Sequence, residues 1–317
     1  MKRRLILVVL LFAFLSACGN VTTPTSTPPM DQYIAQLVDT LVPSITPPTE
    51  PIHLSVISVT PTVSPSATST IPLSTLDPVD WKDWPVIPNI DPSLRAIYEY
   101  GQILGNDPHA FSIFGDCQSR PDAFFGVFET NPAMLMSLSP ELQETVDNFR
   151  GSFNRESPTS QDGTTPGALL WTQWHQGNFT CSFSETPVDC ELRIHQPSFV
   201  IIQIGTHFES RNTEYLRRII TQLMDAGVVP ILATKADNRE KDDRINNDMA
   251  MLAFEYDLPL WNFWAAVSDL PNRGLYTRND RPLQGDIYLT DDAARIHRLT
   301  GLEALNAVWR AAIKTSN

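Results

Sequence analysis

The sequence predicts an α/β fold built on a parallel sheet. Apolar runs at residues 111–114, 199–204, 228–233 and 259–262 have the composition of buried strands. The run at 199–204 is nearly uninterrupted, which is typical of a strand covered on both faces. Helical patterns lie between the later runs. Strands and helices that alternate with short links favour parallel strands joined by right-handed crossovers.

The helical segments follow the strands in order. Asn212 or Thr213 is expected to cap a helix that closes at Gly227 and has an apolar face of Tyr215, Leu216, Ile219, Ile220 and Leu223. Further helices are expected at residues 245–256 and 301–314. Ligand sites in such sheets lie at the carboxyl ends of the strands, which directs attention to residues 115–119, 205–210 and 234–238.

The N-terminus has the parts of an export signal. Three basic residues precede an apolar run at residues 5–15, which is too short to cross a bilayer and is followed by Leu-Ser-Ala-Cys. This tetrapeptide resembles the bacterial lipobox, so residues 1–17 are expected to be removed and Cys18 acylated. The protein would then be extracytoplasmic and anchored to the cell membrane by the lipid on Cys18. The alternative is a plain secretory signal in which Cys18 is incidental.

Composition divides the remaining chain into two parts. Residues 18–79 are rich in Pro, Thr and Ser and contain no Lys or Arg. We expect a disordered tether there, with at most a transient helix at residues 30–42. Residues 80–317 are dense in aromatic and aliphatic side chains and are expected to form one domain.

Charge and motifs exclude several classes of function. The chain has 23 basic and 36 acidic residues, and removal of Lys2, Arg3 and Arg4 leaves 23 − 3 = 20 against 36, a net charge of −16. No dense basic cluster is visible, so nucleic acid is not an expected partner. No phosphate-binding loop, dinucleotide turn or zinc-ligand spacing appears, so we expect neither a cofactor nor a metal.

Three cysteines follow Cys18. Cys181 and Cys190 bracket a short polar segment and are expected to form a disulfide, since an exported protein meets an oxidising compartment. Cys117 is then an odd, free thiol.

The residues after the first strand carry a resemblance to a known family. Residues 115–119 read Gly-Asp-Cys-Gln-Ser, a later buried strand ends in Gly205-Thr206, and the segment 259–264 fits a still later strand. In order and spacing these features resemble the SGNH (GDSL) hydrolases over most of residues 81–317. The resemblance implies an esterase on a three-layer α/β/α, flavodoxin-like sheet. It also implies a Ser nucleophile after Gly-Asp, a late Asp-X-X-His, and an oxyanion hole completed by Gly and Asn.

The sequence departs from the family at every reacting position. Cys117 stands at the nucleophile, and His207 stands where the oxyanion-hole Asn is expected. The late motif has Gly285 in place of the acid and Tyr288 in place of the base. The framework residues Gly115, Asp116 and Gly205 match.

Other residues could in principle restore catalysis. A one-residue shift makes Asp286 the acid, but no His follows it at the needed spacing, and the only later one, His297, lies beyond the motif. Cys117 could act with His207 as its base, although no orienting acid is visible. Tyr288 could serve as an acid or base, but its ordinary pKa of about 10 makes a wall of the cleft the preferred interpretation.

An aromatic cluster precedes the disulfide. Trp171, Trp174, His175 and Phe179 could stack on sugars, but large aromatic side chains more often serve the core, and we expect that here.

The function predicted from the sequence is therefore that of a lipid-anchored cell-surface protein. Its SGNH-hydrolase-like domain is expected to be catalytically degenerate and to bind an envelope glycan or ester. The alternative is an active esterase or acyl-transfer enzyme that uses Cys117. A third interpretation is a different α/β fold with a chance Gly-Asp-Cys.

Overall fold

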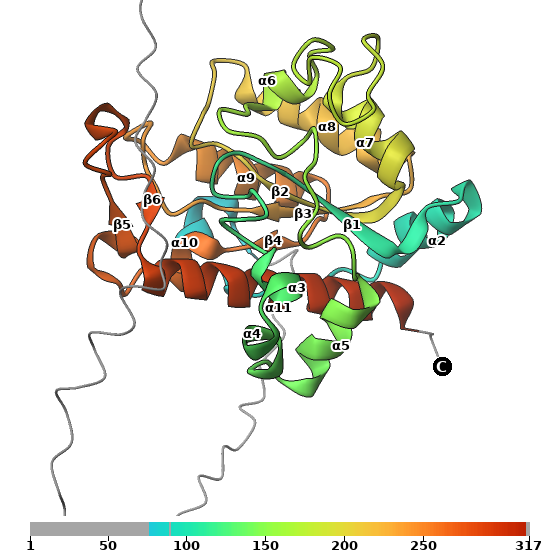
Figure 1. Ribbon diagram of the computed structural model, residues 1–317, viewed down its shortest axis with the longest axis horizontal. Helices are drawn as coiled ribbons and strands as arrows, with labels where there is room; N and C mark the ends of the chain where they lie inside the picture. The colour runs from blue at the N-terminus through green and yellow to red at the C-terminus, as the bar shows by residue number, and fades with distance from the viewer. Residues whose placement is uncertain (1–75, 89, 315–317) are drawn as a thin grey trace, which may run out of the picture. The chain divides into compact units, whose positions relative to one another are not determined.

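The structure, a computed structural model, describes residues 76–88 and 90–314 (Figure 1). The predicted signal, Cys18 and all but the last residues of the predicted tether lie outside the described residues. The first described element, the 3₁₀ helix η2 (Pro78–Asp83), packs against the domain and buries Pro78 and Trp81.

A four-stranded parallel sheet forms the centre of the domain. Its order is β1 (Asp107–Gly115), β2 (Pro197–Gln203), β3 (Val229–Ala233) and β4 (Leu260–Trp261). Every residue of β2 and β3 is buried. The four strands expected from the apolar runs are confirmed, because strands covered on both faces need apolar side chains at nearly every position.

A short segment lies beside the free edge of β1. Gly115 forms a parallel bridge with Ser160, and its N–H donates to the carbonyl of Thr159 at 2.9 Å. After β1 the chain therefore runs along one side of this strand at Ser160, and it later forms β2 on the other side of β1. Strand order reverses at this point, which is where open α/β sheets form ligand crevices.

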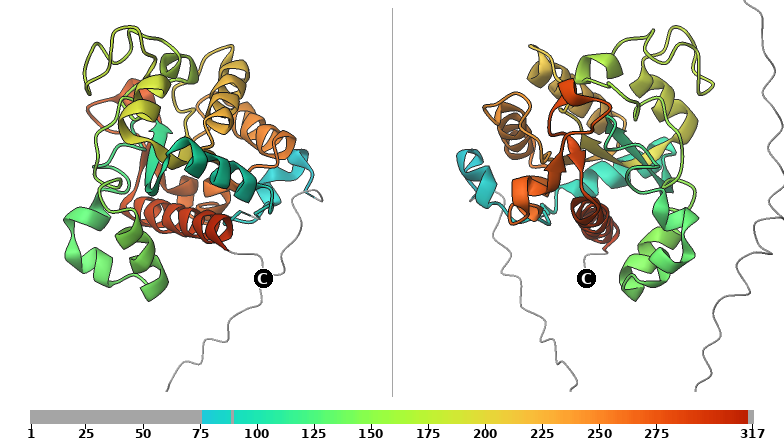
Figure 2. Two further views of the ribbon diagram at one scale, coloured as in Figure 1. Left: turned by 90° about the vertical axis from the view of Figure 1, so that its right-hand side faces the viewer. Right: turned by 60° about the vertical axis from the view of Figure 1, so that its left-hand side comes forward.

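Helices cover both faces of the sheet and give three layers (Figures 1 and 2). One face carries α6 (Pro166–Leu169), α7 (Pro187–His195), α8 (Asn212–Asp225) and α9 (Arg244–Glu255). The opposite face carries α11 (Asp291–Ile313) together with α3 (Val127–Thr130), α4 (Pro132–Met136) and α5 (Pro140–Asn148). The fold is thus a parallel α/β/α sandwich, as predicted.

The remaining elements lie at the ends of the sheet. Helix α2 (Leu94–Leu104) contacts α11, β2 and β3, and α10 (Phe263–Ala266) follows β4. Strands β5 (Leu275–Tyr276) and β6 (Tyr288–Leu289) form an antiparallel pair, with 3₁₀ turns η3 (Pro271–Gly274) and η4 (Pro282–Gln284) beside them. No helix among the described residues is both long enough and apolar enough to span a bilayer.

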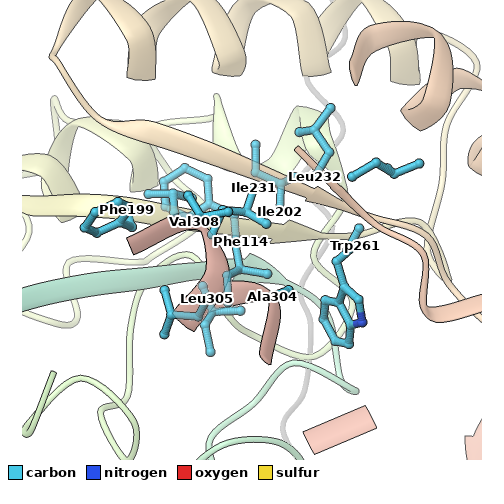
Figure 3. Packing of buried hydrophobic residues seen from close by; sticks show 14 of the residues in the cluster. Phe114, Phe199, Ile202, Ile231, Leu232, Trp261, Ala304, Leu305 and Val308 are labelled. Atoms are coloured by element: carbon cyan, nitrogen blue, oxygen red, sulfur yellow. The ribbon is translucent and has the colours of Figure 1, made fainter. Parts of the chain in front are cut away.

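The core joins the sheet to α11. Figure 3 shows Ala304, Leu305 and Val308 of α11 in one cluster with Phe114 and Phe199 of the sheet. All five side chains are fully buried. Burial of a Leu or Phe side chain contributes about 1.5–3 kcal/mol, so this face anchors the helix.

The last helix starts ten residues before the predicted residue 301. Thr290 caps it by accepting from the N–H of Ala293 at 3.4 Å, and Asp291 and Asp292 in the first turn favour a helix N-terminus. Gly301 lies inside the helix because Phe124 and Trp261 pack where its Cβ would be. The predicted start of the helix, Gly301, is therefore a packing site inside it.

The predicted cap of α8 was also wrong. Arg211 occupies the N-cap position without a capping side chain. Thr213 instead donates from Oγ1 to Asp248 on α9 at 2.6 Å. A contact between two helices therefore takes precedence over the local cap.

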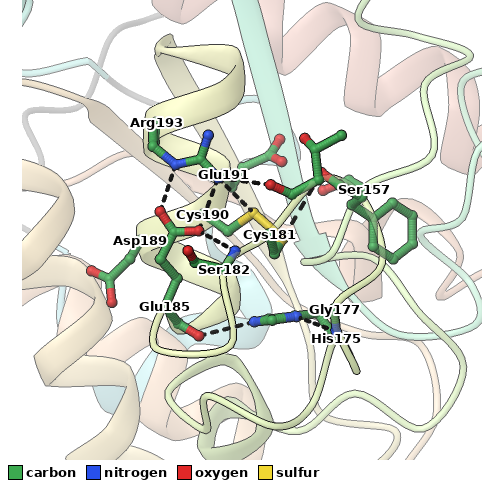
Figure 4. Close-up of a disulfide and its surroundings, with 12 residues drawn as sticks. Ser157, His175, Gly177, Cys181, Ser182, Glu185, Asp189, Cys190, Glu191 and Arg193 are labelled. Atoms are coloured by element: carbon green, nitrogen blue, oxygen red, sulfur yellow. Dashed lines mark hydrogen bonds and ion pairs between the residues drawn. A yellow bond between two sulfur atoms is a disulfide. The ribbon is translucent and has the colours of Figure 1, made fainter.

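The predicted disulfide is confirmed. Cys181 and Cys190 are bonded with their Cα atoms 5.4 Å apart (Figure 4). Cys117 is free. The bridge ties the loop before α7 to its first turn. Beside it, the guanidinium of Arg193 bonds the carboxylate of Glu185 and donates to the carbonyl of Thr180 at 3.0 Å.

The expected burial of the aromatic cluster is wrong for most of its members. His175 is buried, but Trp171 is 53% exposed and Trp174 and Phe179 are half-buried. The segment that carries them contains mostly turns, so it presents no continuous apolar face to the core.

Candidate functional site

A cavity of about 480 Å³ opens at the carboxyl ends of β1 and β2. It is called the Cys117 cavity here, and its lining includes Cys117, Arg120, Asp162, His207, Arg281 and Tyr288. The structure therefore brings together Cys117, His207 and Tyr288, the three residues that the resemblance placed at reacting positions. They come from the turn after β1, the turn after β2 and strand β6.

Cys117 is half-buried and lies in a negative electrostatic field. Burial, together with the carboxylates of Asp116, Asp162 and Asp237, raises the pKa of its thiol to about 12. Since the thiolate is the nucleophile, a thiol that stays protonated near neutral pH is unreactive. The surroundings of Cys117 are the opposite of the electropositive sites that activate cysteines.

Asp116 and Gly205 hold the two turns together. The buried carboxylate of Asp116 accepts from the N–H of Thr206 through Oδ2 at 3.1 Å. Gly205 has φ 142°, and a Cβ there would overlap Ile245. Desolvation, with a contribution from Asp237, raises the pKa of Asp116 to about 6. These residues hold together the two turns that carry Cys117 and His207.

A buried charge cluster lies next to these turns. Nζ of Lys235 is 2.8 Å from Asp237 Oδ1 and 2.6 Å from Glu240 Oε2. Thr206 links the cluster to the Asp116 turn by donating from Oγ1 to Asp237 Oδ2 at 2.7 Å. The cluster lies in and beyond the 234–238 segment that the strand-end rule singled out. The sequence analysis did not predict that Lys235, Asp237 and Glu240 interact.

His207 has no partner that would make it a base. Its Nδ1 is buried without a hydrogen-bond partner in the described part of the chain. Burial, assisted by Arg239, lowers the pKa of its imidazole. A catalytic His normally donates its second N–H to an acid that fixes its tautomer and stabilises the imidazolium. The described residues supply no such acid to His207.

Tyr288 is engaged with its neighbours. Its hydroxyl donates to Oε1 of Gln284, and the guanidinium of Arg278 lies 5.2 Å from the centre of its ring. Gly285, at the position of the family acid, has φ 72° and ψ −163°, a conformation that a side chain makes costly. The backbone at this position therefore favours Gly over an acidic residue.

The two other candidate residues serve the structure. His297 is fully buried in α11, with Nε2 2.6 Å from Oε1 of Gln203 and its ring against Phe124 and Trp261. Its burial lowers the pKa of the imidazole to about 3. Asp286 accepts from the side chain of Asn272 at 3.0 Å and from that of Thr277. Neither His297 nor Asp286 lines the Cys117 cavity.

The sequence analysis did not anticipate the charged walls of the cavity. Arg120 forms ion pairs with Asp122 at 3.2 Å and Asp162 at 3.5 Å on one wall. Arg278 and Arg281 line another wall. These residues lie in irregular segments, where no periodicity marks them; their only signal is the density of Arg before Tyr288.

The structure is similar to that of a GDSL-like lipase from Bacteroides thetaiotaomicron, with a TM-score of 0.40 and 14% identity. The match covers 68% of this chain and 98% of that chain. No protein-family model matches the chain. No curated protein matches its sequence.

Proposed function

We propose that this protein is a lipid-anchored, extracytoplasmic binding protein whose SGNH-hydrolase-like domain is catalytically degenerate and holds an envelope glycan or ester. The observation that carries the proposal is the field around Cys117. Three carboxylates surround the residue at the nucleophile position, and none of the described residues provides an oriented base.

The same field opposes the chemistry of ester cleavage. Acyl transfer passes through a tetrahedral oxyanion, which must be met by donors or positive charge. Groups that disfavour the thiolate of Cys117 also disfavour an oxyanion formed beside it. A cavity of this kind suits a ligand with hydroxyl groups, because these can donate hydrogen bonds to the carboxylates of Asp122 and Asp162.

The anchoring part of the proposal rests on the N-terminal sequence. Its support is the basic start, the short apolar run and Cys18 after Leu-Ser-Ala. Acylation of Cys18 would hold the domain at the membrane surface.

A cysteine-dependent esterase is the second candidate. One observation favours it: His207, with a free Nδ1, lines the same cavity as Cys117. The imidazole could take the thiol proton if a ligand reorganised the cavity.

An ester hydrolysis assay separates the two functions. The purified chain should hydrolyse p-nitrophenyl acetate no faster than Cys117→Ala, since the described residues provide no oriented base and His207 replaces the expected oxyanion-hole Asn. Cys117→Ser should also hydrolyse the ester no faster than Cys117→Ala, because a hydroxyl without a base stays protonated. In serine hydrolases the loss of triad residues costs about 10⁴–10⁶-fold in rate. Turnover by the unmodified chain that Cys117→Ala abolishes would establish the esterase instead.

A further inference from the structure

A second cavity adjoins the Cys117 cavity. It has a volume of about 330 Å³ and is lined by Arg239, Lys241 and Arg273 among others. Gln284 and Ile287 line both cavities, so one stretch of chain forms a wall between them. A ligand that crosses this wall could occupy both spaces.

Several basic side chains at these cavities form no direct ion pair, although Asp286 also lines the second cavity and Arg281 attracts the nearby carboxylate of Asp280. Seven described Lys and Arg residues form no ion pair with a described acidic side chain. Four of them line the two cavities, namely Arg239, Lys241, Arg273 and Arg281. The other three are Arg218, Arg298 and Lys314. In a chain with 36 acidic and 23 basic residues, such a concentration of unpaired cations is unexpected.

Several of these cations are held in place. Arg239 donates from Nη1 to the carbonyl of Thr206 at 3.3 Å, and Arg273 donates from Nε to the carbonyl of Ala236 at 2.8 Å. Arg278 adds a further guanidinium: Nε and Nη2 bond Asp280, while Nη1 has no partner among the described residues. Each guanidinium retains free donors, and preorganised Arg groups bind carboxylate and phosphate well.

The charges are separated within the Cys117 cavity. At its Cys117 end the carboxylates of Asp116, Asp162 and Asp237 disfavour an anion. The nearby cation, Arg120, is already paired with Asp122 and Asp162. Arg278, Arg281 and the tyrosine ring line the same cavity through the segment before β6. An anionic group would therefore bind at the arginine wall, with uncharged hydroxyl groups toward Asp162.

We propose that the two cavities together bind one anionic saccharide chain, whose carboxylate or phosphate groups contact Arg239, Lys241, Arg273, Arg278 and Arg281. The inference rests on the proposed glycan-binding function and specifies the charge and length of the ligand. A saccharide fits better than nucleic acid. The carboxylates beside Cys117 can accept hydrogen bonds from sugar hydroxyl groups, whereas they would repel a dense run of phosphates.

Calorimetric titration of the full chain with trigalacturonate, galacturonate, maltotriose and oligothymidylate tests the inference. Trigalacturonate should bind at least about ten-fold more tightly than galacturonate, since its three carboxylates can contact several of these cations at once, and more tightly than neutral maltotriose. Its affinity should fall as salt rises. The double variant Arg281→Gln, Lys241→Gln should lose about ten-fold or more in affinity. Arg218→Gln removes a cation of α8 that lines neither cavity. Its affinity for trigalacturonate should stay within two-fold of that of the unmodified chain.

Other outcomes would overturn the inference. Equal binding of maltotriose would show recognition of a neutral glycan, which leaves the proposed function standing but removes the charge requirement. Absence of trigalacturonate binding at millimolar concentration, or tighter binding of oligothymidylate, would also reject it. The ester assay decides separately whether the domain is catalytic. Thermal melts of both variants verify that they fold.

Discussion

Two buried carboxylates, Asp116 and Asp237, lie close to Cys117 and are joined through Thr206. Asp237 is compensated by Lys235, whereas Asp116 receives only backbone N–H groups. At the scale of single residues, burial of Cys117 keeps its thiol protonated, and this pair adds to the effect together with Asp162. The same arrangement makes Asp116 costly to ionise.

The raised pKa of Asp116 predicts a pH-dependent contribution to stability. With a folded pKa of about 6 against 3.8, the folded state binds the proton more tightly than the unfolded state. Ionisation therefore costs up to about 3 kcal/mol above pH 6, and this cost disappears as the pH falls toward 4. Lowering the pH from 7.5 to 5 should raise the free energy of unfolding of the unmodified chain relative to Asp116→Asn.

Urea unfolding at several pH values measures this difference. Asp116→Asn also loses a hydrogen bond, but that loss shifts the curve by a nearly constant amount and leaves the pH dependence as the readout. Asp122→Asn, at an exposed carboxylate on the cavity wall, is the matched control and should follow the unmodified chain. A difference that does not change with pH would refute the account of Asp116.

At the scale of elements, α7 shows how a short helix is held against the sheet. Thr186 and Asp189 form a reciprocal capping box, and Pro187 occupies the first turn. The disulfide then closes a loop between the preceding turns and the helix. The box satisfies backbone donors locally, while the bridge restricts the unfolded chain.

Removal of the disulfide should destabilise the domain without altering the cavity. A closed loop of about ten residues is worth about 3 kcal/mol in the chain-entropy model. We expect Cys181→Ala, Cys190→Ala to lose roughly that free energy of unfolding, and trigalacturonate affinity to stay unchanged. Unfolding of the unmodified chain after reduction is the control. A loss below about 0.5 kcal/mol would show that the bridge does not constrain the unfolded chain as the model assumes.

At the scale of the whole domain, the sheet could be predicted from the sequence and much of the cavity could not. Buried parallel strands read as apolar runs, and the disulfide followed from its local spacing. The cavity's arginines lie on irregular segments that tertiary packing brings together, so no local pattern marks them. Gly301 was wrongly taken as the start of the last helix. A glycine can mark the end of a helix or allow close packing inside one, and the sequence does not distinguish the two.

Cys117 links these scales, since its protonation depends on Asp116, Asp162 and Asp237 from three separate segments. The central claim is that this thiol has no base and remains protonated. It is tested most directly by the pH dependence of its alkylation. Iodoacetamide labelling of the free cysteines in the intact protein, followed residue by residue by mass spectrometry, gives the rate for Cys117.

The rate should rise about ten-fold per pH unit from pH 7 to 9.5 without a plateau, because only the small thiolate fraction reacts. His207→Gln should leave the profile unchanged. A plateau that begins below pH 8 and is lost in His207→Gln would reveal an activated Cys117–His207 pair and contradict the degenerate site.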